Sequence, residues 1–146
     1  MVLLTFREIP CTSPLYLQTL ALRERVLRIP IELVLSADDI ADEDQQRHFV
    51  MLDGDDLVAC VVIKPLHATS VKLRQMAVSS LYQGRNVGRD LIVAVEEVLI
   101  GSGITDIEMS ARQSAIGFYE KLGYHVTGEP YIEQGIPHVR MEKTLR

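Results

Sequence analysis

Hydrophobic and polar positions follow two different periods along this chain, one typical of strands and the other of helices. Alternating or fully apolar runs bounded by turn residues predict strands at 2–7, 48–52, 57–65, 71–78, 105–109, 124–132 and 136–144. Apolar residues spaced three and four apart predict helices at 14–29, 88–101 and 112–122. Because helices separate some strands and hairpins join others, we expect a mixed sheet of the α/β or α+β class.

Local signals at the ends of these segments support the assignment. Ser13 followed by Pro14 is a strong helix start, since serine caps the free N–H groups and proline fits the first helical position. The sequence Asp-Gly-Asp-Asp at 53–56 is typical of a hairpin turn. No repeat, linker or low-complexity tract interrupts the pattern, so we expect a single domain over residues 1–146.

Composition and charge narrow the range of partners. The longest apolar run, 57–63, is far shorter than the roughly 20 residues needed to cross a bilayer, so no membrane partner is expected. A net charge of −5 argues against nucleic acid and favours a cationic partner. The two cysteines, Cys11 and Cys60, suit neither a disulfide framework nor a zinc site, so we expect a cytoplasmic protein without metal.

The segment 31–46 has no clear period. It carries a cluster of acidic residues, which we expect to cap short helices and to face solvent: Asp38, Asp39, Asp42, Glu43 and Asp44. Arg23 lies on an otherwise apolar helical stripe, and we expect its guanidinium to extend to solvent, although it could also face a binding site.

The loop between the strand 71–78 and the helix that follows is the best candidate for a binding site. The first N–H groups of a helix lack partners inside the helix and carry a partial positive charge, which together favour an anion. Arg85 and Arg89 near the start of this helix oppose its dipole, and a bound phosphate would offset that cost. The alternative is an ordinary turn with two solvated arginines.

This loop resembles the acetyl-CoA signature of the GNAT acetyltransferases, Gln/Arg-x-x-Gly-x-Gly/Ala, which here reads Gln-Gly-Arg-Asn-Val-Gly at 83–88. Asn86 stands where the family has its first glycine, and asparagine is the residue other than glycine that best tolerates a positive φ. The segments 21–26 and 118–124 are also similar to the family. The segment 135–141 resembles the ElaA/YjcF-like branch.

The resemblance implies the GNAT fold, a mixed central sheet of six to seven strands with about four helices. In this fold the parallel strands 71–78 and 105–109 splay apart at a β-bulge, and the pantetheine arm of acetyl-CoA lies between them. The residues implied to bind acetyl-CoA are Met76, Ala77, Val78, Gln83, Gly84, Arg85, Asn86, Val87, Gly88, Arg89 and Tyr119. The acetyl group then passes directly from acetyl-CoA to an amine.

Direct transfer requires a proton donor and a proton acceptor. Tyr119 matches the family tyrosine that protonates the departing thiolate. His138 is the preferred base, because it alternates with Val139 and therefore faces away from that residue's side of the sheet. His48 and Glu129 are weaker candidates, and water chains can serve instead. Arg112 replaces an asparagine that in the family often contacts pantetheine.

The expected acceptor is a primary amine, either a small cationic amine or an amino-acid-derived one, and a peptide lysine remains open. The alternative function is a non-catalytic acyl-CoA-binding sensor or partner-binding module with the same fold. Dimers are common among such folds, so a homodimer is an expectation as well.

Overall fold

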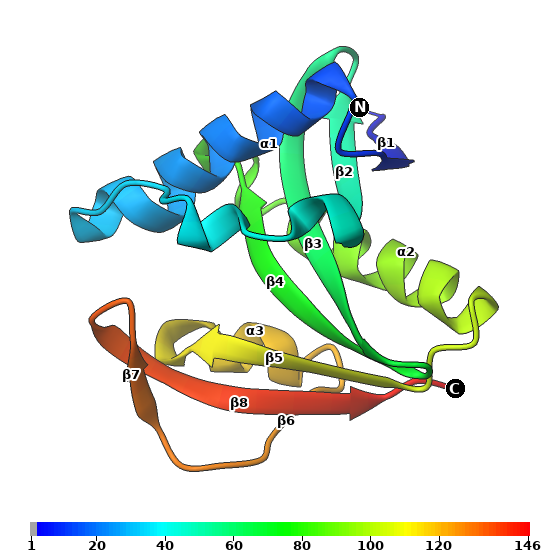
Figure 1. Ribbon diagram of the computed structural model, residues 1–146, viewed down its shortest axis with the longest axis vertical. Helices are drawn as coiled ribbons and strands as arrows, with labels where there is room; N and C mark the ends of the chain where they lie inside the picture. Colours follow the sequence, from blue (N-terminus) through cyan, green and yellow to red (C-terminus); the bar gives the residue numbers. More distant parts are fainter. Residues whose placement is uncertain (1–2) are drawn as a thin grey trace.

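The computed structural model describes residues 3–146, in which eight strands form one sheet with helices on both faces (Figure 1). The strands are β1 (Thr5–Ile9), β2 (Arg47–Asp53), β3 (Asp56–His67), β4 (Ser70–Val78), β5 (Asp106–Arg112), β6 (His125–Val126), β7 (Tyr131–Glu133) and β8 (Ile136–Thr144). The α-helices are α1 (Pro14–Arg23), α2 (Val87–Gly101) and α3 (Ile116–Glu120). A π-helical turn, η1 (Glu24–Arg28), extends α1, and short 3₁₀ turns occupy Ile29–Ile31, Asp38–Ile40, Glu43–Gln45, Ser80–Tyr82 and Gln113–Ala115.

The sheet is mixed, as the alternation of helices and hairpins predicts. Its strand order is β1-β2-β3-β4-β5-β8-β6, and β7 pairs with β8 beside β6. β4 and β5 run parallel, and the other described pairs are antiparallel. This arrangement confirms the expected GNAT architecture with its parallel pair. None of the helices within residues 3–146 is long and apolar enough to span a membrane.

The two faces of β2 and β3 pack against different helices. Phe49 and Met51 belong to the core beneath α2 and α3, whereas Val50 and Leu52 pack with α1 on the opposite face. Because successive side chains of a strand point to opposite faces, strands buried on both sides read as continuous apolar runs. Cys60 lies in such a run and is buried, which agrees with its expected role as a small hydrophobic residue.

Several element boundaries differ from the sequence prediction. The first strand is Thr5–Ile9 instead of 2–7, and Val2 lies outside the described residues. β5 continues to Arg112, which pairs with His138 of β8, so α3 starts at Ile116 and not at residue 112. The predicted strand 124–132 is two strands, β6 and β7, separated around Pro130, which has no N–H group for the ladder. This division accounts for the eighth strand.

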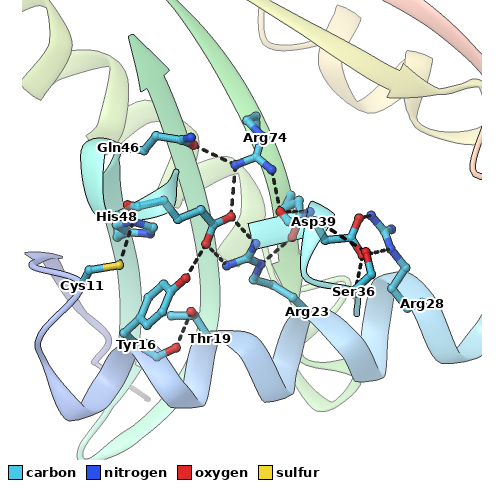
Figure 2. A network of polar contacts seen from close by, with 12 residues as sticks. Cys11, Tyr16, Thr19, Arg23, Arg28, Ser36, Asp39, Gln46, His48 and Arg74 are labelled. Carbon is cyan, nitrogen blue, oxygen red and sulfur yellow. Dashed lines mark hydrogen bonds and ion pairs between the residues drawn. The ribbon is translucent and has the colours of Figure 1, made fainter. Parts of the chain in front are cut away.

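The expectation for Arg23 and for the acidic segment was wrong at the positions that matter most. Arg23 is fully buried, and its guanidinium donates two hydrogen bonds to Glu43, at 2.8 and 2.5 Å. Arg28 is also buried and forms a second bidentate pair, with Asp39, at 2.9 and 3.2 Å. Figure 2 shows Arg23 and Arg28 on the helical segment formed by α1 and η1, with Asp39 beside Arg28. Bidentate pairing satisfies the fork of each guanidinium, which permits burial of charges that would otherwise stay in water.

Glu43 is the acidic centre of this cluster. It accepts further hydrogen bonds from Tyr16 at 2.7 Å and from Arg74 at 3.1 Å. Burial by itself raises the pKa of the Glu43 carboxyl, but the hydrogen bonds from Arg23, Tyr16 and Arg74 outweigh it and leave the pKa below its usual value. Glu43 is therefore ionised at neutral pH.

We predict that Glu43→Gln lowers the free energy of unfolding at pH 7 by about 3–5 kcal/mol, because it leaves Arg23 buried without a counter-charge. Urea titration measures the loss. Since the folded-state pKa of Glu43 is lowered, its contribution is present at neutral pH and disappears as the pH falls through that pKa. The difference in the free energy of unfolding between wild type and variant should therefore become smaller at acidic pH.

Asp44→Asn is the matched control, because Asp44 is the exposed neighbour of Glu43. Its effect should stay within about 0.5 kcal/mol. Equal stabilities of Glu43→Gln and Asp44→Asn at pH 7 would contradict the role given to the buried pair.

Candidate active site

The site begins where β4 and β5 separate. Their parallel pairing runs from Ser70 opposite Asp106 to Leu73 opposite Met109 and stops there, although β4 continues to Val78. In Figure 1 the two strands lie together at one end and diverge toward the other. Beyond Leu73, the edge of β4 that faces β5 has no strand partner within residues 3–146. The expected splayed pair is therefore present.

A β-bulge in β4 causes the separation, as the resemblance implied. The register between β3 and β4 shifts by one residue between Cys60 and Val62, which places the extra residue near Gln75. Gln75 has a positive φ of 48°, a conformation that costs a residue with a side chain roughly 1 kcal/mol or more. The surrounding structure must therefore hold this residue in place.

The buried arginine cluster supplies that support. The Gln75 side-chain carbonyl accepts a hydrogen bond from Arg23 Nε at 2.6 Å, and its amide donates to the Asp39 carbonyl at 3.1 Å. The neighbouring Arg74 donates to the same Asp39 carbonyl at 2.8 Å and to Gln46 at 2.8 Å. The bulge is thus held by the Arg23 side chain of α1 and by the Asp39 carbonyl and the Gln46 side chain of the segment before β2; Figure 2 labels Arg23, Asp39, Gln46 and Arg74.

A cavity of about 360 Å³ lies in the split. Its walls come from β4 at residues 72–76, β5 at residues 109–112, the turn between β7 and β8, the end of η1, and the 3₁₀ turn that carries Asp38 and Asp39. Tyr119 and Ala115 line it from the α3 side. A cavity of this size falls at the small end of the range for small-molecule sites.

Tyr119 is 8% exposed and its hydroxyl lies 3.7 Å from the sulfur of Met76 on β4. The same ring contacts Phe118 and Tyr124 edge-on, which fixes its orientation. Burial raises the pKa of Tyr119 to about 12. The hydroxyl therefore keeps its proton at neutral pH and is able to donate it within the cavity.

His138 lies on β8 and is 4% exposed. Its Nδ1–H donates to the Ile136 carbonyl at 2.9 Å, and because a carbonyl only accepts, this bond holds the proton of a neutral ring on Nδ1. The other nitrogen, Nε2, lies 3.7 Å from a carboxylate oxygen of Glu133. The Tyr131 ring stacks against the imidazole. In the neutral ring, Nε2 is therefore free to accept a proton.

The two weaker base candidates lie away from this cavity. His48 is buried beneath α1, where its Nε2 donates to the Glu43 carbonyl at 2.7 Å. Glu129 is exposed in the connection between β6 and β7. Neither residue lines the cavity, whereas Tyr119 and His138 both do.

The loop before α2 has the conformation that an anion-binding turn needs. Gly84 and Asn86 have positive φ values of 77° and 62°. Asn86 is the N-cap residue of α2, but its side chain makes no capping hydrogen bond, so the first N–H groups of the helix keep no side-chain partner from it. Asn86 thus adopts the positive φ that asparagine was expected to tolerate at this position.

Each of the two arginines of the loop has a partner within the chain, whereas the sequence predicted solvated or phosphate-binding side chains. Arg85 precedes the helix and lies over the Tyr82 ring, 5.6 Å from its centroid. Arg89, in the first turn, pairs with Asp90 at 2.9 Å, which offsets part of its conflict with the helix dipole. Both side chains remain exposed and within reach of a ligand on the loop.

Gly88 is needed for packing. A Cβ atom at this position would lie 2.7 Å from Met76 Cε and 3.3 Å from Phe118 Cζ. The glycine therefore allows the start of α2 to approach β4 and α3 closely, which brings the loop next to the split. A larger residue here would displace the cavity wall as well as the loop.

The comparisons with known proteins agree with this geometry. Residues 34–145 match the family model described as an acetyltransferase (GNAT) domain. The chain belongs to the GNAT family. A relative in Bacillus subtilis, the uncharacterized N-acetyltransferase YjcF, is 28% identical over 102 residues, 69% of this chain and 72% of YjcF. The uncharacterized protein YyaT of the same organism is 32% identical over 76 residues, 52% of this chain, and the chain spans about half of YyaT, 51%.

Solved structures of other proteins have the same fold over nearly the whole chain. A putative N-acetyltransferase from Lactobacillus plantarum superposes with a TM-score of 0.87 at 28% identity, covering 98% of this chain and 99% of that one. Escherichia coli ElaA gives a TM-score of 0.84 at 23% identity, with coverages of 97% and 99%. A GNAT acetyltransferase from Elizabethkingia anophelis with acetyl-CoA bound gives 0.74 at 18% identity, with coverages of 97% and 98%.

The matches to YjcF and to the ElaA fold agree with the expected ElaA/YjcF-like branch. The single-domain organisation, the cytoplasmic location and the homodimer remain predictions.

Sequence reasoning missed several residues of the site. Glu133 was overlooked although it directly precedes a Gln-Gly turn, whose residues Gln134 and Gly135 both have positive φ. That turn was a usable signal, because it places Glu133 opposite Ile136 and close to His138. Gln75 gave no comparable signal, since its role depends on partners far away in sequence.

We predict that Asn86→Gly leaves the affinity for CoA unchanged or improved, because glycine adopts the positive φ at lower cost and no side-chain cap is lost. Isothermal titration calorimetry measures the effect. A loss of more than about tenfold, or 1.4 kcal/mol, would show that the Asn86 side chain itself contacts the ligand. Gly84→Ala is a useful comparison, because its Cβ meets no atom of the described chain yet its φ of 77° disfavours alanine.

Proposed function

We propose that this protein is an N-acetyltransferase that moves the acetyl group of acetyl-CoA directly to a primary amine. The observation that carries the proposal is the split between β4 and β5, with Tyr119 and His138 on the walls of one cavity inside it. The related fold of a GNAT acetyltransferase with acetyl-CoA bound supports acetyl-CoA as the donor.

The free edge of β4 suits the amide-rich pantetheine arm. Met76, Ala77 and Val78 lie on this edge, and Ser79 N–H donates to Val58 of β3 at 2.8 Å. Because N–H groups alternate in direction along a strand, the N–H of Val78 points to the opposite edge, into the split. We assign it the role of polarising the thioester carbonyl.

The loop before α2 is the proposed pyrophosphate site. The N–H groups from Gly84 to Arg89 meet the partial positive charge of the α2 N-terminus, and Gln83 begins the loop with its amide bonded to the Val78 carbonyl at 3.1 Å. That bond ties the loop to the end of β4. The diphosphate and the thioester would thus be positioned by adjoining pieces of backbone.

The chemistry requires two proton transfers. An alkylamine has a pKa near 10.4 and attacks in its minor neutral form, and as the nitrogen bonds to the thioester carbon it must lose one further proton to a base. His138 Nε2 is the proposed acceptor. As the new C–N bond forms and the C–S bond breaks, Tyr119 gives its proton to the departing thiolate, whose parent thiol has a pKa near 8.5. Because Tyr119 is buried and protonated, it is available as the donor.

Labelled acetyl-CoA with a panel of amines tests this function. We expect release of CoA that depends on the acceptor, with the label recovered on the amine. Tight acetyl-CoA binding without acceptor-dependent release from any amine would favour the non-catalytic sensor or partner-binding module, and absence of acetyl-CoA binding would remove both functions.

We predict that Tyr119→Phe lowers kcat by about 10²-fold or more and leaves KM for acetyl-CoA within about threefold, because it removes the proton donor and keeps the ring. Steady-state kinetics separates the two constants. Tyr124→Phe is the matched control, since Tyr124 is buried next to Tyr119 but bonds to Glu96 outside the cavity. A wild-type kcat for Tyr119→Phe would exclude Tyr119 from the mechanism.

A further inference from the structure

Two of the cations that line the cavity, Lys72 and Arg112, form no ion pair among the described residues, and Arg112 is the one opposite His138 on the neighbouring strand. Arg28 pairs with Asp39 at 2.9 Å, and Arg74 pairs with Glu43 at 3.1 Å. Arg112, on β5, pairs with no carboxylate in the described part of the chain. The hydrogen bond that it makes runs from Nη2 to the Leu27 carbonyl at 2.6 Å.

A half-buried guanidinium in this position favours an anion. One carbonyl satisfies one of its five N–H donors, and the group stays charged in proteins. Burial lowers the pKa of Arg112 and the nearby charge of Arg28 lowers it further, so the site destabilises the cation that it contains. A carboxylate in the cavity would relieve this cost and would match the planar fork in a bidentate manner.

Groups suited to an amine lie directly beside Arg112. Arg112 and His138 are partners across the β5–β8 ladder, so they occupy adjacent positions on the sheet. Glu133 lies 3.7 Å from His138 Nε2 and accepts a hydrogen bond from Ser110 at 3.2 Å. The cavity therefore places a cation, Arg112 of β5, and an anion, Glu133 of β7, next to the proposed base His138.

Resting on the proposed function, we propose that the acceptor is an amine that carries its own carboxylate, as an amino acid does. Arg112 binds the carboxylate, and Glu133 and His138 face the amine. A polyamine would place a cation against Arg112 without a counter-charge, and a lysine within a peptide has no carboxylate beside its amine. The cavity of about 360 Å³ also suits a small acceptor.

The overall charge of −5 favours a cationic acceptor, whereas the charges that line the cavity favour a zwitterion. The charges that line the cavity determine which acceptor binds, because at physiological salt the interactions of exposed charges beyond about 8 Å are largely screened.

Arg112 also connects η1 to β5 through its hydrogen bond to Leu27. The experiment must therefore distinguish a role of Arg112 in binding the carboxylate from a role in stabilising the fold. The whole chain is assayed at saturating acetyl-CoA with common L-amino acids and with the amide of each, which removes the carboxylate and keeps the amine. For the best substrate we expect kcat/KM to exceed that of its amide by at least about tenfold. The amine of an amide loses its proton more easily, so intrinsic reactivity works against this result.

We expect Arg112→Gln to abolish the preference by lowering kcat/KM for the acid at least about tenfold and for the amide less than about threefold. Arg140→Gln is the control, because Arg140 lies on the neighbouring strand but has its own partners, Glu108 and Glu142. Its preference should match wild type. Equal losses for acid and amide in Arg112→Gln would show a supporting role alone and overturn the inference.

A preference of the wild-type protein for amides, polyamines or lysine peptides would overturn the inference and leave the proposed function intact. Absence of turnover with every amine would overturn both. Should Arg112→Gln fail to fold, calorimetry on wild type with CoA present compares an N-acetyl amino acid with its amide. We expect tighter binding of the acid by at least about tenfold, and equal affinities would overturn the inference.

Discussion

The buried pair between Arg23 and Glu43 is the interaction on which the geometry of the candidate active site depends. Arg23 uses its two terminal nitrogens on Glu43 and its Nε on Gln75, so one side chain joins the acidic segment to the bulge of β4. The bulge separates β4 from β5, and the separation creates the cavity. A charged pair beneath α1 is therefore linked, through one strand residue with positive φ, to the place where acetyl transfer is proposed.

Charge has two separate roles in this fold. Beneath α1 each buried arginine is matched by a carboxylate, so the cluster contributes rigidity and leaves little charge for a ligand. Inside the cavity the balance is incomplete, since Arg112 lacks a carboxylate partner among the described residues. The first arrangement holds the split open, and the second gives it selectivity. The proposed catalytic residues, Tyr119 and His138, line this same cavity, so their placement depends on both arrangements.

Much of the fold and part of the site could be predicted from the sequence. The turn at Gly54, the helix start at Ser13 and the conformation of Asn86 follow from local preferences, and the structure has each of them. Tyr119, named from the family resemblance, and His138, named from the alternation in the last strand, both line the cavity, and their catalytic roles are proposals. The end of β5 could not be predicted in the same way, because Arg112 has its strand conformation through pairing with His138, a residue of the last strand.

The sequence by itself determined the order of the elements, their periodicity and the loop before α2, because these depend on residues within a few positions of one another. The tertiary structure decided which charges are buried, which partners they have and which cation is left for a ligand. Arg23 and Glu43 are 20 residues apart, Arg23 and Gln75 are 52 apart, and Leu27 and Arg112 are 85 apart. A side chain that looks solvated in the sequence is stabilised in the interior when a distant carboxylate meets it there.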